Sequence, residues 1–163
     1  MNVPTAKPTS EQRAQFYEDG FVVVRSAFSP AEMKPIAAAF ERLLTTANGL
    51  DESGLHHGAH FVIDRPHGWR QPAVVHRVVW AGACEPELLA IGADQRLTAM
   101  AAGLLGSDEF DHLINQAHFK MPRDGVTFAW HQDSVHLRYG TDLWRDVNGL
   151  GSYVQALLAI DPM

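Results

Sequence analysis

The chain has 163 residues, of which 46% are hydrophobic and 20% are charged, and its formal net charge is −6. This length and composition indicate one soluble globular domain, and the acidic balance without any basic run argues against a nucleic-acid-binding protein. The single cysteine, Cys84, excludes an internal disulfide and a cysteine-rich zinc site and fits a reducing, cytoplasmic environment, and no apolar run is long enough to predict a membrane span.

The first residues carry the signals of a short helix. Residues 1–8 are expected to form a loose tail. Thr9 and Gln12 have the spacing of a capping box, which predicts a helix that runs to Asp19 and ends at Gly20. The valine-rich stretch 21–25 that follows is typical of a strand.

A longer second helix is predicted after Ser29. Ser29 is a favourable N-cap, Pro30 suits the first helical position, and Glu32 completes a second capping box. Apolar side chains recur on one face of this helix, at Ile36, Phe40, Leu43 and Leu44. The pair Asn48-Gly49 is expected to end it.

The rest of the chain is expected to alternate between short helices and strands. Residues 49–60 are rich in glycine and histidine and are expected to form a loop. Strands are predicted at 60–64, 73–80, 113–120, 126–133 and 152–160, turns at 122–125 and 148–149, and helices at 85–91 and 95–105, the second ending at Gly106. This order predicts an α+β, mainly β domain with helices packed outside, and the lack of G-x-G-x-x-G and P-loop motifs excludes a doubly wound nucleotide-binding fold.

The motif His131-Gln132-Asp133 ends the strand predicted at 126–133. Residues two apart on a strand point to the same face, so the imidazole of His131 and the carboxylate of Asp133 would converge. Two such groups are part of the ligand set of a mononuclear iron(II) centre. The spacing alone also fits a surface histidine that is hydrogen-bonded to a nearby carboxylate.

Two blocks of sequence place this motif in a family context. The first joins residues 16–25 to 29–33, and the second joins residues 115–122, 130–133 and 152–161. In this order they resemble the phytanoyl-CoA dioxygenase family of iron(II)/2-oxoglutarate oxygenases. The resemblance spans nearly the whole chain and implies a partial double-stranded β-helix, that is, a cupin-like jelly roll, with flanking helices.

The resemblance also implies a site and a reaction. His131 and Asp133 would bind iron(II), and Gln132, Gln116 and Arg77 would line the pocket of the cosubstrate 2-oxoglutarate. The implied reaction uses O2 to hydroxylate a small molecule while 2-oxoglutarate is converted to succinate and CO2. The carboxylate of Asp133 favours hydroxylation, because halogenating relatives would need a small residue at that position.

Two further residues would share a strand face with Gln116, namely His118 and Lys120. Lys120 is a candidate contact for a cosubstrate carboxylate, and the alternative is a surface lysine beside a turn. For His118, a pocket-lining position and a solvated sheet face remain equally open.

The chain departs from the family pattern after Asp133. The family's second ligand histidine and the arginine that grips 2-oxoglutarate lie several strands further on, whereas His136 is the only later histidine here. Residues 9–163 are therefore expected to be the N-terminal portion of a single oxygenase domain, and the chain alone is expected to be inactive. The alternative is a degenerate jelly-roll module that binds a ligand or partner without catalysis.

A separate histidine cluster suggests another metal site. His56 and His60 would share a face of a helix and, with His57, could chelate zinc or iron. Gly54 and Gly58 flank them and favour a loop with solvated histidines instead.

Overall fold

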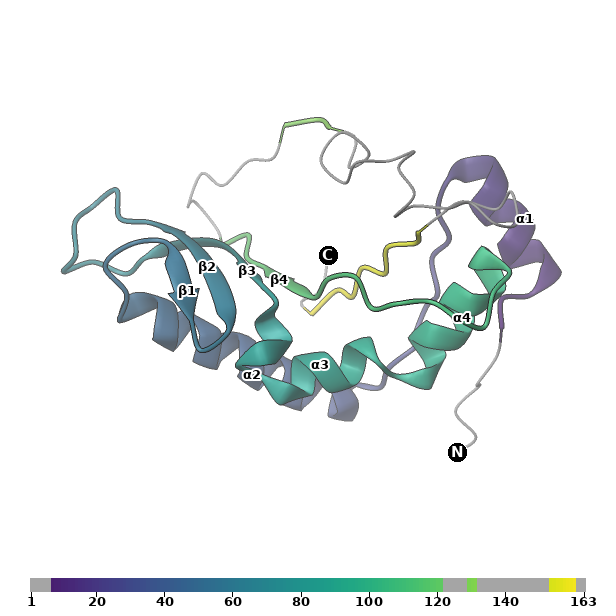
Figure 1. Cartoon of the computed structure of the whole chain (residues 1–163), viewed down its shortest axis with the longest axis horizontal. Helices are drawn as coiled ribbons and strands as arrows, with labels where there is room; N and C mark the ends of the chain where they lie inside the picture. The colour runs from purple at the N-terminus through teal and green to yellow at the C-terminus, as the bar shows by residue number, and fades with distance from the viewer. Residues whose placement is uncertain (1–6, 122–128, 132–152, 161–163) are drawn as a thin grey trace. The chain divides into compact units, whose positions relative to one another are not determined.

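The computed structural model describes residues 7–121, 129–131 and 153–160 (Figure 1). The helices are α1 (Ser10–Asp19), α2 (Pro30–Asn48), the short 3₁₀ helix η1 (Ala81–Ala83), α3 (Pro86–Gly92) and α4 (Gln95–Leu105). The strands are β1 (Gly54–His56), β2 (Ala59–Asp64), β3 (Val74–Val79) and β4 (Gln116–His118). This mixture confirms the α+β part of the prediction. Helix exceeds strand in the described part of the chain, so the expected mainly β character is not found there, and the jelly roll stays a prediction.

The chain divides into two compact units. Unit 1 comprises residues 1–27, 94–111 and 128–159 and contains α1 and α4. Unit 2 comprises residues 28–93, 112–127 and 160–163 and contains α2, α3, η1 and the four strands. Across the described residues, no helix has both the length and the apolar character needed to cross a membrane.

The predicted helix ends are confirmed. The Thr9 side chain accepts a hydrogen bond from the Gln12 backbone at 3.1 Å, and the Gln12 side chain accepts one from the Thr9 backbone at 2.9 Å. The same reciprocal pair forms between Ser29 and Glu32 at the start of α2. Gly20 ends α1 with φ +80°, a left-handed conformation that glycine adopts without steric cost.

The core of unit 2 lies between α2 and one face of the antiparallel sheet, whose strand order is β1-β2-β3-β4. Figure 1 shows α2 running along this face. Ile36 and Leu43 are buried on α2, as the predicted apolar stripe requires. Phe61, Val78 and Ala117 are directly paired across β2, β3 and β4, and all three are almost completely buried. This row of cross-strand neighbours fixes which face of the sheet meets the helix.

Four local predictions are wrong or only partly right. The stretch 21–25 is not a strand, since it forms no ladder with the described strands and leaves Phe21 and Val23 exposed. Residues 153–160 are likewise outside any strand, and only 116–118 of the stretch 113–120 is paired. Residues 54–56, expected in a loop, pair with β2. Strand formation depends on a hydrogen-bonded neighbour, which residue preferences cannot supply.

Some predictions lie outside the described residues. These are the turns at 122–125 and 148–149, residues 1–6 of the tail, and most of the strand predicted at 126–133. The tail's last residue, Pro8, is buried, and a side chain added to Gly103 of α4 would collide with it.

Arg65 joins the end of α2 to the β2–β3 loop. Its guanidinium donates hydrogen bonds to the carbonyls of Asn48 at 2.7 Å, Leu50 at 2.5 Å and Gln71 at 2.7 Å. The last carbonyls of a helix have no partner within the helix, and a cation near them is also favoured by the helix dipole. One side chain therefore caps α2 and holds the loop.

We predict that Arg65→Met lowers the free energy of unfolding by about 2 kcal/mol, because several carbonyls lose a charged donor while the apolar stem is retained. Chemical denaturation measures this change. Arg70→Met is the matched control in the same loop, since the Arg70 guanidinium lies 5.0 Å from the Trp69 ring on the exposed surface. Equal effects of the two substitutions would contradict the capping role of Arg65.

The β1–β2 hairpin turns through His57 and Gly58, whose φ angles are +48° and +83°. Two successive positive φ angles define the type I′ turn, which matches the twist of paired strands. A Cβ on Gly58 would also lie 3.1 Å from the Cβ of Ala83.

Gly58→Ala is expected to destabilise the protein by about 1–2 kcal/mol, because alanine is strained in the left-handed region. Gly54→Ala is the control, since Gly54 has open space around its Cβ position and no positive φ. Thermal unfolding of both variants tests the assignment, and a neutral Gly58→Ala would refute it.

Candidate functional site

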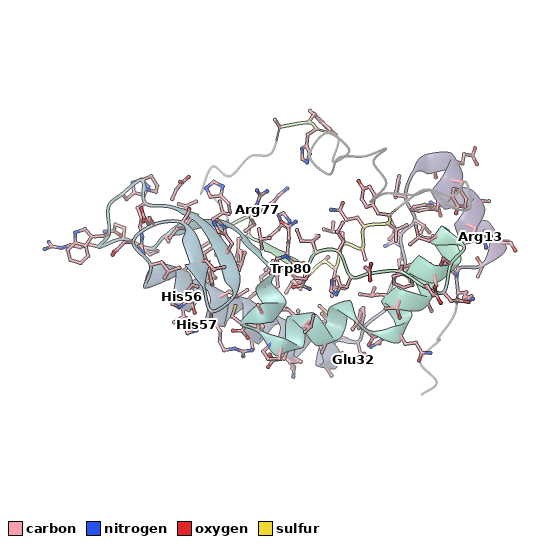
Figure 2. All side chains as sticks on the ribbon, viewed as in Figure 1. Arg13, Glu32, His56, His57, Arg77 and Trp80 are labelled. Carbon is pink, nitrogen blue, oxygen red and sulfur yellow. The ribbon has the colours of Figure 1, made fainter. Side chains whose placement is uncertain are left out.

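The face of the sheet away from α2 carries a polar cluster from β3 and β4. Arg77 is paired with His118, and Val79 is paired with Gln116. Paired residues of antiparallel strands point to the same face, and residues two apart do so too. Arg77, Gln116 and His118 therefore lie together, opposite the face that carries Val78. Figure 2 shows Arg77 on the side of the sheet away from α2.

Two atoms of this cluster are buried and lack a hydrogen-bond partner among the described residues. They are Nε of Arg77 and Oε1 of Gln116. Leaving such an atom unpaired costs about 1–3 kcal/mol, and folded proteins pair most of them. The two unpaired atoms lie on neighbouring strands and on one face of the sheet. A polar ligand bound there would complete their hydrogen bonds.

The chemistry of the two groups indicates an anionic ligand. The Arg77 guanidinium is a permanent cation whose N–H groups match a carboxylate. The Gln116 amide can donate or accept, because rotation by 180° exchanges its oxygen and nitrogen. Together they suit a small molecule that carries a carboxylate and a second polar group.

Positive charge extends along the same face through Lys120. Lys120 follows His118 by two residues, and its charge acts on the His118 ring. Crowding of the ring by surrounding protein atoms, then the charges of Arg77 and Lys120, hold the pKa of His118 below its usual value. His118 is nevertheless exposed and can be reached by solvent. The cluster is thus a cationic surface around two unsatisfied buried groups.

Asn115 fixes the start of β4 and with it the position of Gln116. Its side-chain oxygen accepts a hydrogen bond from the Gly82 backbone at 3.0 Å, and its amide donates to the Leu88 carbonyl at 3.0 Å. The Asn115 carbonyl accepts from the Ala81 backbone at 3.2 Å. No sequence signal identified this role, because its partners lie 27 and 33 residues away along the chain.

No sequence signal predicted the histidine–aspartate pair that lies next to Arg77. The ring nitrogen Nε2 of His76 lies 2.8 Å from Oδ2 of Asp64. The pair forms where the β2–β3 register shifts between Val62 and Ile63. Such a shift is a β-bulge, in which one strand carries an extra residue and a side chain changes direction. The alternation of residue types along a strand does not predict where a bulge occurs.

The His131 ring is hydrogen-bonded to a nearby backbone carbonyl. Its Nδ1 lies 2.7 Å from the carbonyl oxygen of Ala129, and a carbonyl only accepts hydrogen bonds. Nδ1 therefore carries the proton, and in the neutral ring Nε2 carries the lone pair. His131 belongs to unit 1, whereas Gln132 and Asp133 lie outside the described residues. The iron-ligand assignment of His131 and Asp133 stays a prediction.

The hypothesis of a metal site at His56, His57 and His60 is wrong as formulated. These residues form a hairpin in which His60 is paired with Leu55, so His56 and His60 point to opposite faces. The His56 ring instead packs with those of His57 and Phe61, at centroid distances of 4.2 and 6.1 Å. In residues 7–121, 129–131 and 153–160, no three histidine, cysteine or acidic side chains form a potential metal site.

Comparisons with known proteins agree with the resemblance found in the sequence. A relative, the ectoine dioxygenase of Sphingopyxis alaskensis, is 27% identical over 125 residues, which is 77% of this chain and 37% of that protein. The chain thus matches little more than a third of the relative's length. No solved structure matches the chain. A family model described as phytanoyl-CoA dioxygenase matches residues 16–163, so the chain belongs to the phytanoyl-CoA dioxygenase family.

Proposed function

We propose that the chain carries cosubstrate- and iron-binding residues of an iron(II)- and 2-oxoglutarate-dependent oxygenase that hydroxylates a small molecule with O2. The observation that supports this most strongly is the pair of unsatisfied buried atoms on Arg77 and Gln116. These are two of the positions that the family resemblance assigns to the 2-oxoglutarate pocket.

The polar face of β3 and β4 suits 2-oxoglutarate by charge and by hydrogen bonding. One carboxylate of the cosubstrate would accept from Nε of Arg77, where burial limits competition by water. The Gln116 amide would bond a second oxygen of the same molecule. The positive charge of Lys120, which acts on the nearby His118 ring, would also attract the doubly negative 2-oxoglutarate.

His131 and Asp133 would hold the metal, and Gln132 would lie beside the cosubstrate. The proton on Nδ1 of His131 leaves Nε2 as the donor atom for a metal. Bound iron and 2-oxoglutarate would supply the oxidising power for O2 activation, and the protein would supply ligation and orientation. The family's remaining histidine and arginine are not assigned to residues of this chain.

A small molecule is the proposed substrate class. The matching relative from Sphingopyxis alaskensis is named for its action on ectoine, which is itself a small molecule.

The cosubstrate assignment predicts opposite effects on binding and on stability. Arg77→Met and Gln116→Leu should each weaken 2-oxoglutarate binding by about 10- to 100-fold, because a hydrogen bond to the charged ligand is lost. Each should leave the stability of the ligand-free protein unchanged or raised, because a buried unsatisfied atom is removed. Calorimetric titration and chemical denaturation measure the two effects.

Arg70→Met is the control for loss of an arginine at the surface of the same unit. It should change neither quantity, because Arg70 contacts the exposed Trp69 ring. Unchanged binding in the Arg77 and Gln116 variants would refute the assignment of this face.

The iron assignment is tested by anaerobic titration of the chain with iron(II) and 2-oxoglutarate. A charge-transfer absorption band that needs both additions is expected. His131→Ala or Asp133→Ala should weaken iron binding by on the order of 100-fold or more, since loss of an outer-shell partner alone costs about 10- to 100-fold. His136→Ala is the control and should retain the band. No band with the unaltered chain, together with intact 2-oxoglutarate binding, would favour a non-catalytic binding module.

A further inference from the structure

We propose that His118 is a further ligand contact on this face, and that it becomes protonated when the anion binds. Loading of the site would then take up a proton, and affinity would rise as the solution becomes more acidic. This inference rests on the proposed function, because the anion concerned is the cosubstrate.

The position of His118 carries the argument. It is the direct cross-strand partner of Arg77, whose buried Nε has no partner among the described residues. Paired side chains on antiparallel strands have Cβ atoms about 4.5–5.5 Å apart. An anion bound to Arg77 would therefore lie within reach of the His118 ring. His118 is exposed, so a ligand from solution can reach it.

Burial and the charges around His118 disfavour protonation of its ring before the anion arrives. Partial burial lowers its pKa, and the positive charges of Arg77 and Lys120 lower the pKa further. The β2 groups on this side of the sheet are His60 and Asp64. Asp64 is engaged with His76, so its carboxylate is committed to another ring. Among the described residues, the charges that act on the His118 ring are those of the cations Arg77 and Lys120.

A bound anion reverses this balance. Its negative charge offsets Arg77 and Lys120 and favours the imidazolium form of His118, which raises the pKa of the ring. Proton binding and anion binding then strengthen each other by the same factor, because linkage between two binding events is reciprocal. A rise of one pKa unit corresponds to about tenfold in affinity between the protonated and neutral forms. The carboxylates of the ligand stay ionised above about pH 6, so they do not contribute to this dependence.

The test uses the metal-free chain with 2-oxoglutarate as the probe, at constant ionic strength. Omitting iron removes the pH dependence of the proposed metal ligands. NMR titration of the histidine ring signals should show that the pKa of His118 rises by about one unit in saturating 2-oxoglutarate. The dissociation constant should increase several-fold, up to about tenfold, between pH 6 and pH 8.

Two variants separate the charge of His118 from its bulk. His118→Gln should bind more weakly at pH 6 and lose the pH dependence, whereas His118→Lys should keep tight binding at both pH values. His67→Gln, in the β2–β3 loop, is the control and should behave as the unaltered chain does.

The outcomes distinguish this inference from the proposed function. Binding that needs Arg77 but takes up no proton would overturn the role of His118 and leave the cosubstrate site intact. Binding that depends on neither Arg77 nor Gln116, or no binding at all, would overturn both. The inference would be supported by a raised pKa of His118 in bound protein together with an affinity that depends on pH. This pH dependence should be lost in His118→Gln, and His118→Lys should bind tightly at both pH values.

Discussion

The register between β3 and β4 is the constraint on which the candidate site depends. Pairing Val78 with Ala117 places both in the core, and the same pairing sets Arg77 beside His118 on the other face. A slip of one residue on β4 would move its polar side chains into the core and Ala117 to the surface. The apolar core therefore enforces the polar cluster, although no apolar residue belongs to it.

Contacts far from the polar face protect that register. Asn115 ties the start of β4 to the backbone of Gly82 and Leu88 through its side chain. Arg65 caps α2, the helix that covers the opposite face of the sheet, and joins it to the β2–β3 loop. Each of these contacts satisfies backbone groups that would otherwise lack partners. These contacts hold the backbone around the two strands whose side chains are proposed to bind a ligand.

The same arrangement places ligand binding in opposition to stability. Nε of Arg77 and Oε1 of Gln116 are withdrawn from water without compensation by the described residues. Burial of the His118 ring and the positive charges of Arg77 and Lys120 disfavour its protonated form, which lowers its pKa. Sites that prepare charge and hydrogen-bonding groups for a ligand commonly carry such a cost. The charge of a bound anion would remove this cost at Arg77, Gln116 and His118.

The sequence by itself determined the features that depend on near neighbours. Capping residues set the starts of α1 and α2, and glycine set the ends of α1 and α4, since each of these signals acts within a few residues. The family resemblance singled out Arg77 and Gln116, but only the tertiary structure paired their strands and showed the buried, unsatisfied atoms. It also decided that the stretch 21–25 stays unpaired, that His56 and His60 diverge in a hairpin, and that His76 meets Asp64. These outcomes depend on partners distant in the chain and on register, which residue preferences and motif spacing do not encode.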